Sequence, residues 1–184
     1  MATQHREPSR GGVPDERPTL LGRGIPCMPE SPTTQHLETQ LAVARDLVHR
    51  LVLVAGTDPV AKSRLLREAA ELGKFPVLNV GEQLAKSLMQ LSVRQRPGRA
   101  AQELSSLLSE CRAETVVLDH IEILFAPELR LDVMRLLQSL SRNTTLLVAW
   151  PGDVSDVDVG YAPSDHREHQ RSSLDGAVVA SMSS

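Results

Sequence analysis

The sequence predicts an α/β fold in which helices cover both faces of a parallel β-sheet, in three layers. Two observations predict this class. Short runs rich in Val and Leu suit strands that are buried on both faces, and stretches with helical spacing of apolar residues separate these runs. Alternation of such strands and helices is typical of parallel sheets. The strands are expected at Leu51–Ala55, Phe75–Val80, Thr115–Asp119 and Thr144–Trp150.

Helices are expected before, between and after these strands. After the first strand, for example, Leu65, Leu66, Ala69 and Leu72 share one helical face, and Gly73 follows as a stop signal. The helices are expected at His36–Arg50, Lys62–Leu72, Gly81–Leu91, Arg99–Cys111 and Glu128–Ser141. Val157–Tyr161 is expected to be a last, edge strand.

The 184 residues divide into one ordered domain and two extensions. Residues 1–32 are rich in Pro, Gly, Arg and Glu without a hydrophobic period, which predicts disorder; Met28 is an alternative start. Residues 33–163 suffice for one domain with its own core. Residues 164–184 are rich in Ser, His and Arg and are predicted to be a disordered tail, so His166 and His169 are interpreted as tail residues. A C-terminal helical lid domain is not expected.

Composition narrows the functional classes. A net charge of −3 argues against a protein coated with nucleic acid, so any DNA contact would need a local basic patch. Aromatic residues make up 2% of the chain, which disfavours base stacking. Cys27 and Cys111 lack metal-binding spacing and suggest a reduced, cytoplasmic setting. No apolar stretch could span a bilayer or serve as a signal peptide, so no membrane partner is expected.

The residues after the first strand follow the spacing of a phosphate-binding loop, G-x-x-x-x-G-K-[ST], with Ala at the second Gly. In such a loop Gly56 makes the turn, Lys62 reaches the β- and γ-phosphates, and Ser63 ligates Mg²⁺. The preceding strand and following helix supply the required context. The predicted phosphate-binding residues are Gly56, Thr57, Ala61, Lys62 and Ser63.

Two features of this loop weaken the match. Ala61 costs about 1 kcal/mol or more if its position requires positive φ. Asp58 places a carboxylate in a loop meant for anions. The alternative interpretation is an ordinary strand–turn–helix connection in which the Lys-Ser pair arises by chance.

The acidic end of another predicted strand, Thr115–Asp119, completes the predicted site. Asp119 follows Thr-Val-Val-Leu and is expected to bind Mg²⁺ through water, although an Asp at a strand end also commonly caps the next helix. His120 occupies the place where many such ATPases have a catalytic Glu. Glu122 is therefore the candidate general base, or else it supports the following turn.

Other residues near this edge have two interpretations each. Trp150 ends the last predicted core strand and is either a core residue or an adenine platform. Arg142 either complements the end of its helix or acts as an arginine finger on a neighbouring subunit. Arg94 and Arg96 belong to a basic loop, residues 94–98, that is either solvated or touches a phosphate backbone, and together with Arg99 they are the residues that would favour DNA binding.

Several blocks resemble one known family. LDHIEILF (118–125), LRLDVMRLLQSLSRN (129–143), TTLLVAWPG (144–152) and GYAP (160–163) resemble the BrxF family, small P-loop proteins of type 3 BREX bacteriophage-defence systems. The resemblance spans His36 to His169 and implies an ATPase of the additional-strand, AAA+-like (ASCE) kind. It implies phosphate-loop residues at Gly56, Lys62 and Ser63, and the magnesium Asp at Asp119. Ala61 departs from the Gly of that family.

The resulting hypothesis is a cytoplasmic P-loop protein of a BREX complex that binds ATP and Mg²⁺ and couples nucleotide state to partner proteins. The resemblance implies those partners: a larger ATPase, a methyltransferase, a helicase and a phosphatase-like protein. A homo-oligomer is also envisaged, because such sites often need a neighbour's residues. Hydrolysis is expected to be slow. The alternative is a non-hydrolysing adaptor with a degenerate site, favoured by Asp58, Ala61 and His120.

Overall fold

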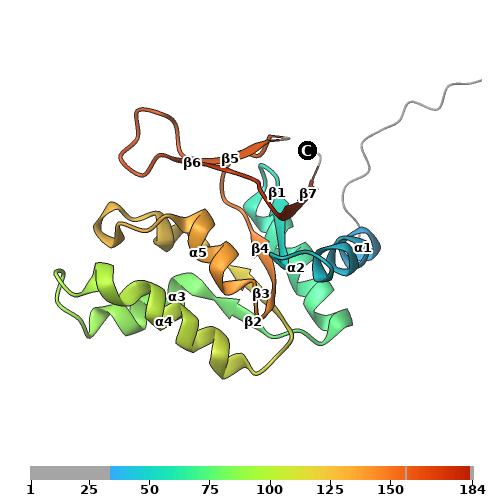
Figure 1. Cartoon of the computed structure of the whole chain (residues 1–184), viewed down its shortest axis with the longest axis horizontal. Helices are drawn as coiled ribbons and strands as arrows, with labels where there is room; N and C mark the ends of the chain where they lie inside the picture. Colours follow the sequence, from blue (N-terminus) through green and yellow to red (C-terminus); the bar gives the residue numbers. More distant parts are fainter. Residues whose placement is uncertain (1–33, 156, 183–184) are drawn as a thin grey trace, which may run out of the picture.

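The computed structural model describes residues 34–155 and 157–182 as an α/β unit (Figure 1). The predicted disordered segment 1–32 and the alternative start at Met28 lie outside the described residues. The elements are α1 (Thr34–Arg45), β1 (Leu51–Ala55), α2 (Pro59–Gly73), β2 (Val77–Asn79), α3 (Val80–Met89), α4 (Arg96–Cys111), β3 (Thr115–Asp119), the 3-10 helices η1 (Ile121–Phe125) and η2 (Pro127–Leu129), α5 (Val133–Leu140), β4 (Thr145–Ala149), β5 (Asp158–Tyr161), β6 (Gln170–Ser173) and β7 (Ala177–Ser181).

The central sheet has five parallel strands in the order β2-β3-β4-β1-β7. Strands β1, β3 and β4 are buried along their whole length, as their continuous apolar runs predict. The predicted strands Leu51–Ala55 and Thr115–Asp119 are confirmed at both ends. Strand β4 lies between β1 and β3, so the two predicted halves of the site stand on strands separated by one other strand.

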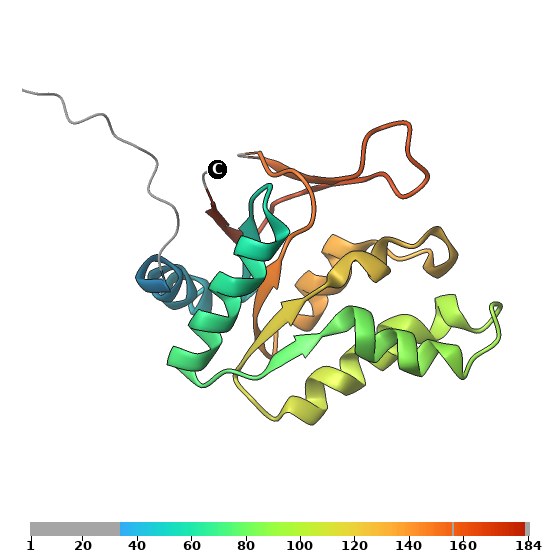
Figure 2. The same cartoon turned by 180° about the vertical axis from the view of Figure 1, so that it is seen from behind.

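Alternate residues of each strand face opposite layers of helices. Leu51 and Leu53 of β1 belong to the core beneath α3, α4 and α5, whereas Val52 and Val54 belong to the core beneath α1 and α2. Figures 1 and 2 show these two groups of helices on opposite sides of the sheet. The expected helix–sheet–helix layering is therefore present.

The C-terminal region differs from the prediction. Residues 164–184 were expected to be a disordered tail, but β6 and β7 lie within them, and β7 pairs with β1 as an edge of the main sheet. Val157–Tyr161 was expected to be the edge strand; β5 instead pairs with β6 in a separate two-stranded antiparallel sheet. The apolar run Ala177–Ala180 pairs with β1 on the side opposite β4, which partly buries apolar residues that the sequence placed in a tail.

Most helix ends also differ from the prediction by one to five residues, and at two of the helix starts a capping residue explains the difference. Helix α2 begins at Pro59 rather than Lys62, because Asp58 caps it and Pro suits a first helical position. The segment expected to form one helix at Glu128–Ser141 is divided: η2 ends at Leu129, and Asp132 then caps α5. Local capping residues thus decide both boundaries.

Candidate functional site

A cavity of about 480 Å³ lies at the carboxyl edge of the central sheet, where open α/β sheets bind ligands. Its walls come from the loop after β1, the start of α2, the end of β3, the segment after β4, Tyr161 of β5 and the end of β7. The predicted residues Gly56, Thr57, Lys62, Ser63, Asp119 and Glu122 all line it. Ala61 is not among the residues that line it.

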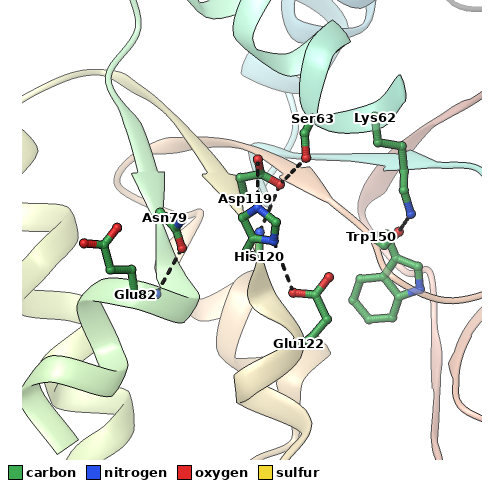
Figure 3. A network of polar contacts seen from close by, with 8 residues as sticks. All are labelled: Lys62, Ser63, Asn79, Glu82, Asp119, His120, Glu122 and Trp150. Atoms are coloured by element: carbon green, nitrogen blue, oxygen red, sulfur yellow. Dashed lines mark hydrogen bonds and ion pairs between the residues drawn. The ribbon is translucent and has the colours of Figure 1, made fainter. Parts of the chain in front are cut away.

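Ser63 and Asp119 are in direct contact across the cavity. The Ser63 hydroxyl donates a hydrogen bond of 3.1 Å to Oδ1 of Asp119, as Figure 3 shows. The same oxygen accepts a 3.0 Å bond from the backbone N–H of His120, which orients the carboxylate. Asp119 is 4% exposed. A hydroxyl and a carboxylate held this close are ligands that Mg²⁺ accepts alongside water and phosphate oxygens.

Lys62 points into the cavity but is held by the protein. Its side chain is 5% exposed, and its ammonium donates a 2.6 Å hydrogen bond to the backbone carbonyl of Trp150, just beyond β4 (Figure 3). Burial lowers the pKa of Lys62, and the carboxylates of Glu122, Asp119 and Asp58 oppose that shift. A ligand phosphate would therefore have to compete with the Trp150 carbonyl.

The loop after β1 is shorter than a phosphate-binding loop needs. Only residues 56–58 separate β1 from α2, because residues 59–61 are helical. Oδ1 of Asp58 accepts bonds from the backbone N–H groups of Val60 (2.9 Å) and Ala61 (3.1 Å). The carboxylate that the sequence placed against a phosphate thus occupies helix amides that an anion would use.

The C-terminal strand closes one side of this loop. The N–H of Met182 donates to the carbonyl of Ala55 over 2.7 Å, and a Cβ added at Gly56 would lie 2.9 Å from the Met182 Cβ. Gly56 is required here by this close approach. Ser181 and Met182 line the cavity and were missed by sequence reasoning, although the apolar run after Asp175-Gly176 was a usable strand signal.

His120 and Glu122 lie beside Asp119. His120 adopts the left-handed conformation (φ 55°), with Nε2 at 3.8 Å from Oδ2 of Asp119 and Nδ1 at 4.0 Å from Oε2 of Glu122. Glu122 belongs to η1 and reaches the cavity wall. Within residues 34–155 and 157–182, no group of three or more His, Cys, Asp or Glu side chains is arranged to hold a metal ion.

Tyr161 lines the cavity, and the buried rings of Phe125 and Trp150 pack next to it. The Trp150 ring is 2% exposed, packs edge-on against Phe125 at 5.5 Å, and donates from Nε1 to the Gly160 carbonyl over 3.1 Å. Tyr161 stacks on Phe125 at 3.8 Å. Trp150 is thus a core residue, as the first of its two interpretations predicted, and not an exposed platform for adenine. It connects the Lys62 side of the cavity to the β5–β6 hairpin.

No model of a known protein family, no curated protein and no solved structure matched this chain. Among the described helices, none is long and apolar enough to cross a membrane.

Proposed function

We propose that this chain is an ATP–Mg²⁺-binding protein of the P-loop type that couples nucleotide state to partner proteins. The observation that carries the proposal is the contact between Ser63 and Asp119 beside the inward-pointing Lys62, at the carboxyl edge of a parallel sheet. Strand β4 between the two site strands agrees with an additional-strand ATPase. Ser63 and Asp119 would hold Mg²⁺, which neutralises phosphate charge when bound, and Lys62 would bind phosphate oxygens.

Hydrolysis by the isolated chain is expected to be slow or absent. A general base must reach the attacking water. His120, rather than Glu, follows Asp119, and Glu122 lies on a 3-10 helix beside His120. Glu122 is the residue we propose to orient that water. From the resemblance to the BrxF family we propose that the protein acts in the cytoplasm with type 3 BREX partners, which would include a larger ATPase, a methyltransferase and a phosphatase-like protein.

A second candidate function is a non-hydrolysing adaptor with a degenerate site. It is favoured by one specific observation, the Asp58 carboxylate on the first amides of α2. Nucleotide binding would require residues 59–61 to leave the helix and Lys62 to leave the Trp150 carbonyl. In an adaptor these contacts would simply be permanent, and the surface would dock the larger components.

Lysine variants separate the two functions. The chain has lysines only at 62, 74 and 86, and Lys86 is an exposed residue paired with Glu82. ATP–Mg²⁺ should raise the thermal midpoint of the wild type and of Lys86→Met, but not of Lys62→Met, in differential scanning calorimetry. Lys62→Met keeps the side-chain length and avoids a cavity. An equal shift in all three proteins, or none in the wild type, contradicts the assigned site.

A further inference from the structure

A cluster of arginines lies outside the candidate site. Arg94 belongs to the α3–α4 connection, Arg99 to the first turns of α4, Arg130 to the residues after η2, and Arg167 to the β5–β6 connection. We call the surface formed by these four residues the arginine groove. All four side chains are exposed. In both views the three connections project from the side of the molecule away from α1 (Figures 1 and 2).

Two depressions make up the arginine groove, and Arg94 borders both. The first, of about 460 Å³, is lined by Arg94, Arg130 and Arg167 together with Val93, Pro97, Pro127 and Glu128. The second, of about 520 Å³, is lined by Arg94, Arg99, Gln95, Gly98 and Gln102. Four guanidinium groups thus face one carboxylate among the lining residues. Segments far apart in the sequence supply them, which a single basic loop could not do.

Internal partners do not neutralise these arginines. Across residues 34–155 and 157–182, the ion pairs of arginine involve Arg64, Arg135 and Arg171, and none involves the arginine groove. Arg96, which the sequence grouped with Arg94 and Arg99, instead turns its Nε towards the Leu91 carbonyl at 3.4 Å. The charge in the arginine groove is therefore available to an external anion.

The N-terminal end of α4 adds to the positive electrostatic potential of the arginine groove. Gln95 stands at the cap position of α4 but makes no capping bond; its Oε1 accepts from the N–H and hydroxyl of Ser92 instead. The positive end of a 16-residue helix therefore faces the second depression without a side-chain cap.

We propose that the arginine groove binds the phosphate backbone of duplex DNA. Arginine matches phosphate bidentately, and two depressions that share Arg94 suit a ligand with repeated phosphates. The lining contains no aromatic side chain, so it lacks both a stacking platform for bases and the aromatic anchor typical of a protein interface. Binding would therefore be independent of sequence. The net charge of −3 confines it to this local surface.

Salt dependence is the signature to measure. Four phosphate contacts predict a slope of log K against log salt of about −3.6, so affinity falls about 150-fold between about 50 and about 200 mM salt. Anisotropy of a dye-labelled duplex of mixed sequence, titrated with the full chain, gives this slope. The triple variant Arg94→Gln/Arg130→Gln/Arg167→Gln should reduce the slope to about −0.9.

A matched control removes three exposed arginines elsewhere. Arg67→Gln/Arg112→Gln/Arg142→Gln changes the net charge equally and should keep the wild-type slope. Equal losses in both triple variants, or no binding by the wild type at low salt, would overturn the proposal. So would polyglutamate competing as well as unlabelled duplex of the same charge, because that result assigns the surface to an acidic protein segment. Circular dichroism verifies that both variants fold.

Discussion

The cavity at the carboxyl edge and the arginine groove are both polar, but their charged groups are in opposite situations. In the cavity, Lys62 binds the Trp150 carbonyl and Asp119 binds Ser63, while the exposed Asp58 beside it binds the first amides of α2. In the arginine groove, no guanidinium pairs with a carboxylate of the described residues. A ligand must displace the partners of buried charges in the first region, whereas among the described residues the one side-chain hydrogen bond of the arginine groove's guanidinium groups is the exposed 3.3 Å contact from Arg99 Nη1 to Oε1 of Gln102. Burial explains this difference for Lys62 and Asp119, because a buried charge must be paired whereas an exposed one need not be.

Removing Trp150 should have the largest effect, because this side chain links the two regions. Its carbonyl holds Lys62, and its indole holds β5, whose hairpin carries Arg167. Trp150→Ala should lower the free energy of unfolding by about 3–5 kcal/mol, measured by urea denaturation followed by circular dichroism. Trp150→Phe should lose less, since it keeps most of the buried ring. A wild-type unfolding curve for Trp150→Ala would show that the two regions are held independently.

Removing the cap of α2 should have an intermediate effect and sharpen the contrast. Asp58→Ala loses two bonds to helix amides and should cost about 1 kcal/mol of stability. The freed amides should also strengthen ATP–Mg²⁺ binding, measured by isothermal titration calorimetry. Asp132→Ala, which removes the cap of α5 at the Arg135 N–H, should cost a similar amount without changing nucleotide affinity. Identical nucleotide affinities in all three proteins would show that Asp58 does not compete with a ligand.

The titration of Lys62 should have the smallest effect. Burial lowers its pKa below 10.5, so between the lowered value and 10.5 the unfolded chain binds more protons than the folded one. Stability from this residue therefore rises with pH across that window. The difference in unfolding free energy between wild type and Lys62→Met should change in favour of the wild type as pH increases through it. A difference that stays constant would mean that Lys62 is not desolvated.

The β1, β3 and β4 strands could be predicted from the sequence because their continuous apolar runs have no other stable location than the centre of a parallel sheet. The convergence of Lys62, Ser63 and Asp119 followed from the same reasoning, since carboxyl ends of parallel strands meet at one edge. The strand β7 was missed because its partner, β1, lies more than half the chain away, and the intervening residues look like a polar tail.

The state of the loop could not be predicted, because two local preferences compete there. The G-x-x-x-x-A-K-S spacing favours an open loop, whereas Asp58-Pro59 is a strong start for a helix, and in the structure the helix start prevails. The arginine groove could not be predicted from the sequence either. Arg130 and Arg167 join Arg94 only through the packing of distant segments, which spacing along the chain does not encode.

Trp150 is the single tryptophan of the chain, and it lies between Lys62 and the β5–β6 hairpin. The intrinsic fluorescence of the unlabelled protein therefore comes from one indole. Its position means that ligand binding in the cavity and movement of the hairpin would both change this fluorescence. A shift to longer wavelength would report that water had reached the ring, and time-resolved quenching would give the rate at which this happens. The molecule carries its own optical probe at the junction of its two polar regions.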